Sequence, residues 1–189
     1  MADEYGKMFK RIWGDPDFRA LVGAEQLMYA KLISQSDISL AGVVTAAPTR
    51  WAKQTAGTSV GAIQDALDGL ERARFIIVDE DTEEILVRSY IRADGLWKSS
   101  KTMKAISGAV KRVLSKKLRC EISRELARLD TSGLTEETAN GFRSRDYIEG
   151  LIGNLIAEYP IPGACQIVCV WGLVNVGVDA VGVGDCELG

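Results

Sequence analysis

The hydrophobic positions of the chain change their period between residues 42 and 92. Four apolar residues first recur at spacings of three and four, which places them on one face of a helix: Val60, Ile63, Leu67 and Leu70. Two short runs rich in β-branched residues follow at 76–78 and 85–87, as is typical of the strands of a hairpin. The pattern therefore predicts a helix over 59–74 and then a β-hairpin.

A second, shorter helix is predicted just upstream. Proline is tolerated in the first turn of a helix, so Pro48 can open a helix over 48–56 with Trp51 and Ala52 facing inward. The preceding residues 43–45 form a short apolar run that reads as a strand.

The two predicted helices are joined by only a few residues. Gly57 supplies the turn, and the hydroxyl of Thr58 or Ser59 can cap the second helix. A strand, two closely connected helices and a hairpin are the signature of a winged helix-turn-helix. We expect a mainly α fold with a small β-hairpin wing, an α+β chain, followed by C-terminal helices.

Further apolar stripes predict helices on both sides of this unit. Upstream, residues 15–21 form a turn or helix with Trp13 and Phe18 as core anchors, and the next helix has its stripe at Ala24, Leu27, Met28 and Leu32. Downstream, helices are predicted over 102–114 and 118–129, with this apolar set: Met103, Ile106, Val110, Val113, Leu118, Ile122 and Leu126. A last helix is expected over 147–159.

These elements divide the chain into four predicted parts. They are a winged helix-turn-helix domain over 1–95, a basic helical extension over 96–130, a linker over 131–144, and a C-terminal helix with an apolar tail over 145–189. The segment 163–184 is rich in valine and glycine and approaches the roughly 20 residues that cross a bilayer. Because polar residues and glycines interrupt it, packed or edge-pairing β structure is favoured over a membrane span.

The composition argues against most catalytic classes. The chain has no histidine, the commonest general base and metal ligand, and it lacks a phosphate-binding loop of the GxxxxGK[ST] type. Its four cysteines are too sparse for a disulfide framework, and Cys165, Cys169 and Cys186 do not have the spacing of a zinc site. The N-terminus has no signal-peptide core. We predict a cytoplasmic protein that is not an enzyme, with no metal and no cofactor.

The charge is distributed unevenly along the chain. The net charge is −3, yet the segment 95–120 holds eight basic residues and no acidic one. Since −3 minus +8 is −11, the remainder is strongly acidic. A local basic segment of this kind is the electrostatic footprint expected for a nucleic-acid partner.

The chain resembles a known group in several separated motifs: IWGDPDFRAL, GAEQLMYAKLISQSDISLAGVV, RWAKQTA and DALDGLERARFIIVDEDTEEILVRSYIR. These are similar to the winged helix-turn-helix DNA-binding, replication-initiator-like proteins of actinobacteriophages. The resemblance implies a phage-encoded DNA-binding role in replication initiation or gene regulation, inside a bacterial host. The chain departs from that pattern at Ala93, where relatives tend to carry histidine, and in its apolar tail.

The first set of candidate DNA contacts lies on the predicted helix pair. It consists of Arg50, Lys53, Gln54, Thr58, Ser59 and Gln64. Gln64 has the amide that reads an adenine edge, and Arg50 and Lys53 would hold phosphates. The same residues also suit a solvated amphipathic pair, because Asp65, Asp68 and Glu71 lie on the exposed side of that helix and repel phosphate.

The hairpin tip carries five carboxylates between residues 79 and 84, so it is expected to be solvated and turned away from DNA. Arg88 and Arg92, expected on one strand face, either touch a DNA backbone or neutralise acidic neighbours.

The second set of candidates supplies phosphate contacts from the basic segment. It consists of Lys98, Lys101, Lys104, Lys111, Arg112, Lys116 and Lys117. The alternative is a basic face that packs against the acidic remainder of the chain.

Two functions are therefore open. One is a phage protein that binds double-stranded DNA, and the other is a winged-helix interaction module whose acidic face binds a host protein. Self-association into a homo-oligomer is open in both.

Overall fold

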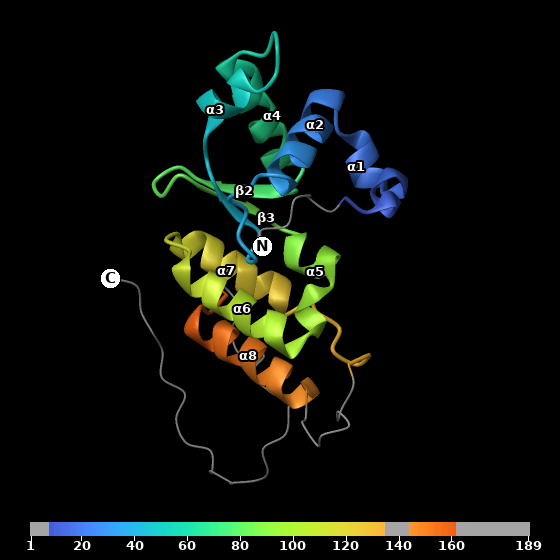
Figure 1. Ribbon diagram of the computed structural model, residues 1–189, viewed down its shortest axis with the longest axis vertical. Helices are drawn as coiled ribbons and strands as arrows, with labels where there is room; N and C mark the ends of the chain where they lie inside the picture. The colour runs from blue at the N-terminus through green and yellow to red at the C-terminus, as the bar shows by residue number, and fades with distance from the viewer. Residues whose placement is uncertain (1–7, 135–143, 162–189) are drawn as a thin grey trace, which may run out of the picture.

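The computed structural model describes residues 8–134 and 144–161 (Figure 1). It is mainly helical with a small three-stranded antiparallel sheet, an α+β architecture as predicted. The elements are η1 (Lys10–Gly14), α1 (Pro16–Ala20), α2 (Gly23–Ile33), β1 (Val43–Thr45), α3 (Pro48–Lys53), α4 (Val60–Arg72), β2 (Ile76–Asp79), β3 (Glu84–Val87), α5 (Tyr90–Asp94), η2 (Leu96–Lys98), α6 (Ser100–Arg112), α7 (Lys116–Leu126) and α8 (Ser144–Glu158).

The sheet lies between two helical layers and is apolar on both faces. Its strands run in the order β1-β3-β2, with Val44 and Val78 both opposite Ile85 of the central strand. Successive residues of a strand point to opposite faces. Ile85 therefore belongs to one core and its neighbour Leu86 to the other, both almost inaccessible to water.

The upper layer, α1 to α4, covers the first face of the sheet (Figure 1). Trp51 is completely buried there, and its indole N–H donates to Gln35 Oε1 at 3.0 Å. Gly69 permits close packing of α4 on α2, because a Cβ at this position would collide with the Glu25 carboxylate. That carboxylate also accepts the backbone N–H of Val22 and so holds the start of α2.

The lower layer, α6, α7 and α8 with η2 and α5, covers the second face (Figure 1). Every downstream apolar residue of the predicted stripes is buried in it, from Met103 to Leu126. Trp97 and Ile148 complete this core. The predicted domain boundaries remain predictions, but α6 and α7 share the sheet with the upper layer.

The edge strand β2 is blocked by side chains from both layers. Glu71 of α4 accepts the backbone N–H of Val78 at 3.0 Å, and Lys117 of α7 donates to the Val78 carbonyl at 2.7 Å. An open edge strand would offer these groups to another chain. Glu71 and Lys117 thus have structural roles that the sequence pattern did not indicate.

Several expectations about exposure were wrong. Trp13 is 58% exposed and touches the core only through an edge-on contact with Phe18, because η1 lies at the outside of the upper layer. In α2 the buried face is Met28, Tyr29, Leu32 and Ile33, which leaves Ala24 and Leu27 exposed. Val60 is also exposed, since it begins α4 ahead of the first turn that meets the core.

Most helix and strand bounds lie within two or three residues of the predictions; α3 ends at Lys53 rather than at residue 56, and α5 was not predicted. β1 is confirmed at Val43–Thr45, whereas α4 ends two residues early because Arg74 turns into the left-handed region at φ 61°. Most of the predicted linker and the whole 163–184 tail lie outside the described residues. Among the helices in the described ranges, none is long and apolar enough to span a bilayer.

Candidate nucleic-acid interface

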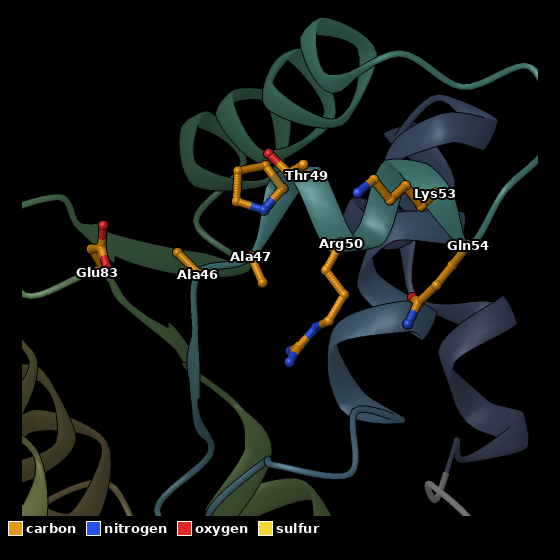
Figure 2. Close-up of a pocket in the computed structure, with 8 residues that line it drawn as sticks. Ala46, Ala47, Thr49, Arg50, Lys53, Gln54 and Glu83 are labelled. Atoms are coloured by element: carbon orange, nitrogen blue, oxygen red, sulfur yellow. The ribbon is translucent and has the colours of Figure 1, made fainter.

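The first candidates lie around α3, beside an open hollow of about 780 Å³. Arg50 and Lys53 are exposed on α3, and Figure 2 shows Glu83 of the hairpin tip across the hollow from them. Arg50 is paired with Asp37 at 3.2 Å, so part of its charge is neutralised within the protein. Gln54 lines the same hollow just after α3. Lys53 makes no hydrogen bond or ion pair with any described residue.

The exposed face of α4 is polar but acidic. Ser59 is the helix cap, and its hydroxyl accepts the Ala62 N–H at 3.1 Å, while Thr58 is half-buried beside it. The side-chain N–H of Gln64 donates to Asp68 Oδ1 at 3.0 Å. This hydrogen bond occupies the amide group with which Gln64 would read an adenine edge. Asp65 and Asp68 remain exposed, so a phosphate approaching this face meets negative charge.

The hairpin carboxylates do not form one solvated tip, which corrects the sequence prediction. Glu80, Asp81 and Glu83 are exposed, but Asp79 and Glu84 are half-buried against the lower layer. Asp79 accepts the Ser115 hydroxyl, and this hydrogen bond, followed by the N–H groups of residues 81 and 82, holds the pKa of Asp79 below its usual value. The hairpin is therefore attached to the connection between α6 and α7.

Glu84 makes the second attachment. Its carboxylate accepts the backbone N–H of Leu114 at 3.1 Å and that of Ser115 at 2.8 Å. Charge-assisted hydrogen bonds of this kind are stronger than neutral ones. The sequence pattern could not reveal them, because they join residues about thirty positions apart.

The second set of candidates forms a basic stripe on α6. Lys101, Lys104, Lys111 and Arg112 share one exposed face of this helix. Lys111 is paired with Glu158 of α8 at 3.1 Å; the Tyr159 hydroxyl, and secondly Lys111, lower the pKa of Glu158. The other three form no hydrogen bond or ion pair with a described residue.

The remaining basic candidates differ in their surroundings. Lys116, in the first turn of α7, is exposed and has no such partner in the described part of the chain. Lys117 is held by the Val78 carbonyl and lies 3.9 Å from Glu71. Lys98 lies over the Trp97 ring, 5.8 Å from its centroid. Within this second set, the structure separates free cations, namely Lys101, Lys104, Arg112 and Lys116, from cations engaged within the fold; in the first set Lys53 is free as well.

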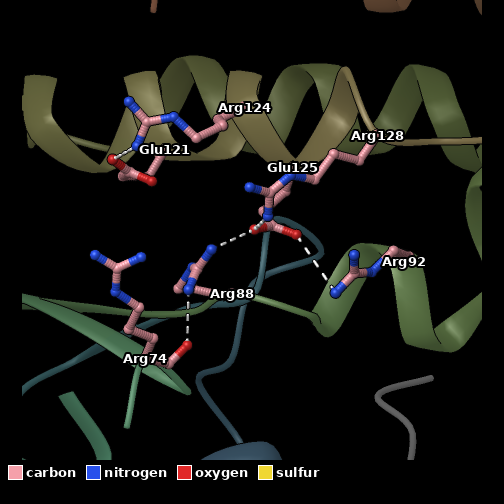
Figure 3. Close-up of polar contacts among 7 residues, drawn as sticks. All are labelled: Arg74, Arg88, Arg92, Glu121, Arg124, Glu125 and Arg128. Carbon is pink, nitrogen blue, oxygen red and sulfur yellow. Dashed lines mark hydrogen bonds and ion pairs between the residues drawn. The ribbon is translucent and has the colours of Figure 1, made fainter. Parts of the chain in front are cut away.

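An arginine cluster around Glu125 was not predicted as a unit. Glu125 of α7 is only 3% exposed and is approached by Arg88 at 2.9 Å, Arg128 at 2.9 Å and Arg92 at 3.7 Å (Figure 3). Arg92 lies on α5, so the expectation that it shares a strand face with Arg88 was wrong. Arg88 and Arg92 were expected either to touch a DNA backbone or to neutralise acidic neighbours, and their pairing with Glu125 is a neutralising contact.

The two candidate sets do not meet on one surface. The α3 and α4 residues belong to the upper layer, and the basic stripe belongs to the lower layer, with the sheet between them (Figure 1). Among the described residues, no group of three or more histidine, cysteine or acidic side chains could hold a metal ion. Of the four cysteines, Cys120 is half-buried, and the others lie outside those residues.

Comparison with other proteins adds no relative to these observations. No family model matches the chain, and no curated protein and no solved structure matches it.

Proposed function

We propose that this chain is a phage-encoded winged helix-turn-helix protein that binds double-stranded DNA in replication initiation or gene regulation, with phosphate contacts from its lower layer. Three features support the winged-helix assignment. The elements follow one another as α2, β1, α3, α4, β2 and β3, the connection between α3 and α4 is short, and the hairpin pairs beside β1 in the order β1-β3-β2. The phage setting rests on the resemblance in sequence motifs.

The observation that carries the DNA-binding proposal is the set of free cations. Lys101, Lys104, Arg112 and Lys116 are exposed, and no carboxylate among the described residues pairs with them. A cation without a protein partner keeps its full attraction for a phosphate. Each phosphate that it neutralises releases counterions from the duplex and adds about −0.9 to the slope of log K against log salt concentration.

The test is fluorescence anisotropy on a labelled random duplex at several salt concentrations. The wild-type protein is compared with a variant that carries Lys101→Gln, Lys104→Gln, Arg112→Gln and Lys116→Gln. We expect weaker binding and a salt slope that is shallower by about 0.9 for each phosphate that the variant no longer neutralises.

A matched control distinguishes these positions from general charge. The double variant Lys104→Gln/Arg112→Gln is compared with Lys10→Gln/Arg19→Gln, which removes one lysine and one arginine from exposed positions of the upper layer. Equal effects of the two doubles would contradict the assignment to α6. Wild-type protein that does not bind duplex at low salt would contradict DNA binding itself.

A second candidate function is supported by the exposed acids of α4. Asp65 and Asp68 have no basic partner among the described residues, and they suit a basic patch on a host protein. Under this alternative, Asp65→Asn/Asp68→Asn abolishes partner capture. If α4 instead approaches DNA, the same variant raises duplex affinity, because phosphate repulsion falls.

A further inference from the structure

The connection between α6 and α7, residues 113–115, turns one apolar side chain inward and the next outward. Val113 is buried in the lower core, whereas Leu114 is 70% exposed, the largest exposed fraction of any large hydrophobic side chain in the described residues. Single exposed leucines are common on protein surfaces. What distinguishes Leu114 is how its backbone is held and which side chains surround it.

The backbone of Leu114 is fixed on both sides by side chains. Glu84 accepts its N–H at 3.1 Å, and the Arg119 guanidinium donates to its carbonyl at 3.4 Å. The next residue is fixed as well, since Glu84 accepts the Ser115 N–H and Asp79 accepts the Ser115 hydroxyl. The exposed leucine therefore stands on a braced corner, as a preorganised contact residue should.

Free cations flank the leucine in the sequence. Arg112 precedes it by two residues and Lys116 follows it by two, and neither has a partner among the described residues. Four residues of chain span at most about 14 Å. That span suits contacts with both phosphate strands beside a minor groove about 6 Å wide.

We propose that the α6–α7 corner enters a minor groove of duplex DNA, where Leu114 wedges between base pairs while Arg112 and Lys116 hold the phosphates on either side. This inference rests on the proposed DNA-binding function and names the groups that touch the bases. Leucine is among the apolar side chains that partly unstack a base step and bend the duplex. An aliphatic side chain suits this role better than binding of single strands, which relies on aromatic stacking.

The charges around the corner favour DNA over a protein partner. The chain has no acidic residue from 95 to 120, and the two nearest hairpin carboxylates, Asp79 and Glu84, are committed to Ser115 and the backbone. Asp79 and Glu84 therefore act as a brace for the cationic corner, whereas Glu80, Asp81 and Glu83 remain exposed at the hairpin tip.

The test measures affinity and bending together on the full chain. A duplex labelled at both ends reports bending by energy transfer, and anisotropy reports affinity at several salt concentrations. Leu114→Ala is compared with Leu27→Ala, a leucine of the upper layer that is 57% exposed. We expect Leu114→Ala to bind about tenfold more weakly and to abolish the bend, with an unchanged salt slope, and Leu27→Ala to behave as wild type.

The other outcomes contradict either the leucine wedge or the proposed DNA binding. If the wild type binds duplex with a steep salt slope and Leu114→Ala binds and bends it equally well, the wedge is wrong, the proposed function stands, and the leucine belongs to a protein contact. Binding without any bend in the wild type also overturns the wedge. If the wild type does not bind duplex at all, the proposed function fails first.

A second pair of variants tests Glu84 as a positioning residue, and the two explanations predict opposite signs. If Glu84 only repels phosphate, Glu84→Ala strengthens binding. If it braces the corner, Glu84→Ala weakens binding and reduces the bend by severalfold, while Glu84→Gln, which keeps an acceptor oxygen, restores much of both. Glu83→Ala removes a neighbouring exposed carboxylate and should not weaken binding. Strengthened binding by Glu84→Ala would contradict the brace.

Discussion

The two helical layers share one sheet but differ sharply in charge. Residues 8–95, which build the upper layer, the sheet and α5, contain ten basic and thirteen acidic residues. Residues 96–134 and 144–161, which build η2, α6, α7 and α8, contain eleven basic and six acidic residues. The α3–α4 pair, which we propose as a helix-turn-helix, is thus the less suitable surface for a polyanion. The proposed helix-turn-helix lies in the upper layer, whereas most of the exposed unpaired basic candidates lie in the lower layer. We therefore place the proposed phosphate contacts on the lower layer.

The first prediction tests whether the layers are one cooperative unit. Ile85→Ala opens a cavity in the upper core and Leu86→Ala opens one in the lower core, and each should lower the free energy of unfolding by about 2–5 kcal/mol. Because both residues lie on the central strand, urea unfolding followed by fluorescence and circular dichroism should show a single transition for each variant. Two separated transitions would contradict a shared unit, and Leu27→Ala serves as the exposed control.

The second prediction concerns the ion-pair cluster that ties α7 to the end of β3. Glu125→Ala leaves Arg88 only 18% exposed and without its carboxylate, so we expect a decrease of about 2 kcal/mol in the free energy of unfolding. Glu121→Ala, on the same helix, removes a local pair with Arg124 and should cost less than about 1 kcal/mol. Equal decreases in urea denaturation would show that the cluster does not join the layers.

The third prediction concerns the acidic face of the upper layer. Asp65→Asn/Asp68→Asn should raise duplex affinity about two- to fivefold at low salt if α4 approaches DNA, because two exposed charges are removed. Anisotropy at about 50 mM and about 200 mM salt measures the increase, which should shrink at the higher concentration. An unchanged affinity would leave the lower layer as the only DNA-binding surface among the regions described. Glu71 is excluded from this variant because it holds Val78.

The smallest expected effect is a pH dependence at the hairpin brace. The Ser115 hydroxyl lowers the pKa of Asp79 in the folded chain, so the stabilisation is complete above the unfolded value of 3.8 and disappears as pH falls through the lower folded value. Wild-type protein should be slightly more stable than Asp79→Asn at about pH 6. The difference should vanish in urea titrations at the acid end of this window, and a difference that is independent of pH would contradict the charge-assisted hydrogen bond.

The buried residues of a helix could be predicted where apolar residues recur regularly along that helix. The three- and four-residue spacing in α4, α6 and α7 identified most of their buried residues, because a helix that covers a sheet must turn one face inward. The same reasoning failed for Leu27 and Trp13. Leu27 has the expected spacing and Trp13 was expected as a core anchor, but both side chains are more than half exposed.

Neighbouring positions in the chain were enough to predict the order of most helices and strands, though not α5 and η2, and also the buried faces of most helices and the basic character of residues 95–120. Which charges are free, in contrast, depends on the tertiary structure. Lys111 and Lys117 are engaged while Lys104 and Lys116 are not, and Glu84 serves the α6–α7 corner rather than the solvent. An ion pair or hydrogen bond between residues thirty or more positions apart leaves no periodic signal in the chain, because it depends on how the two layers meet across the sheet.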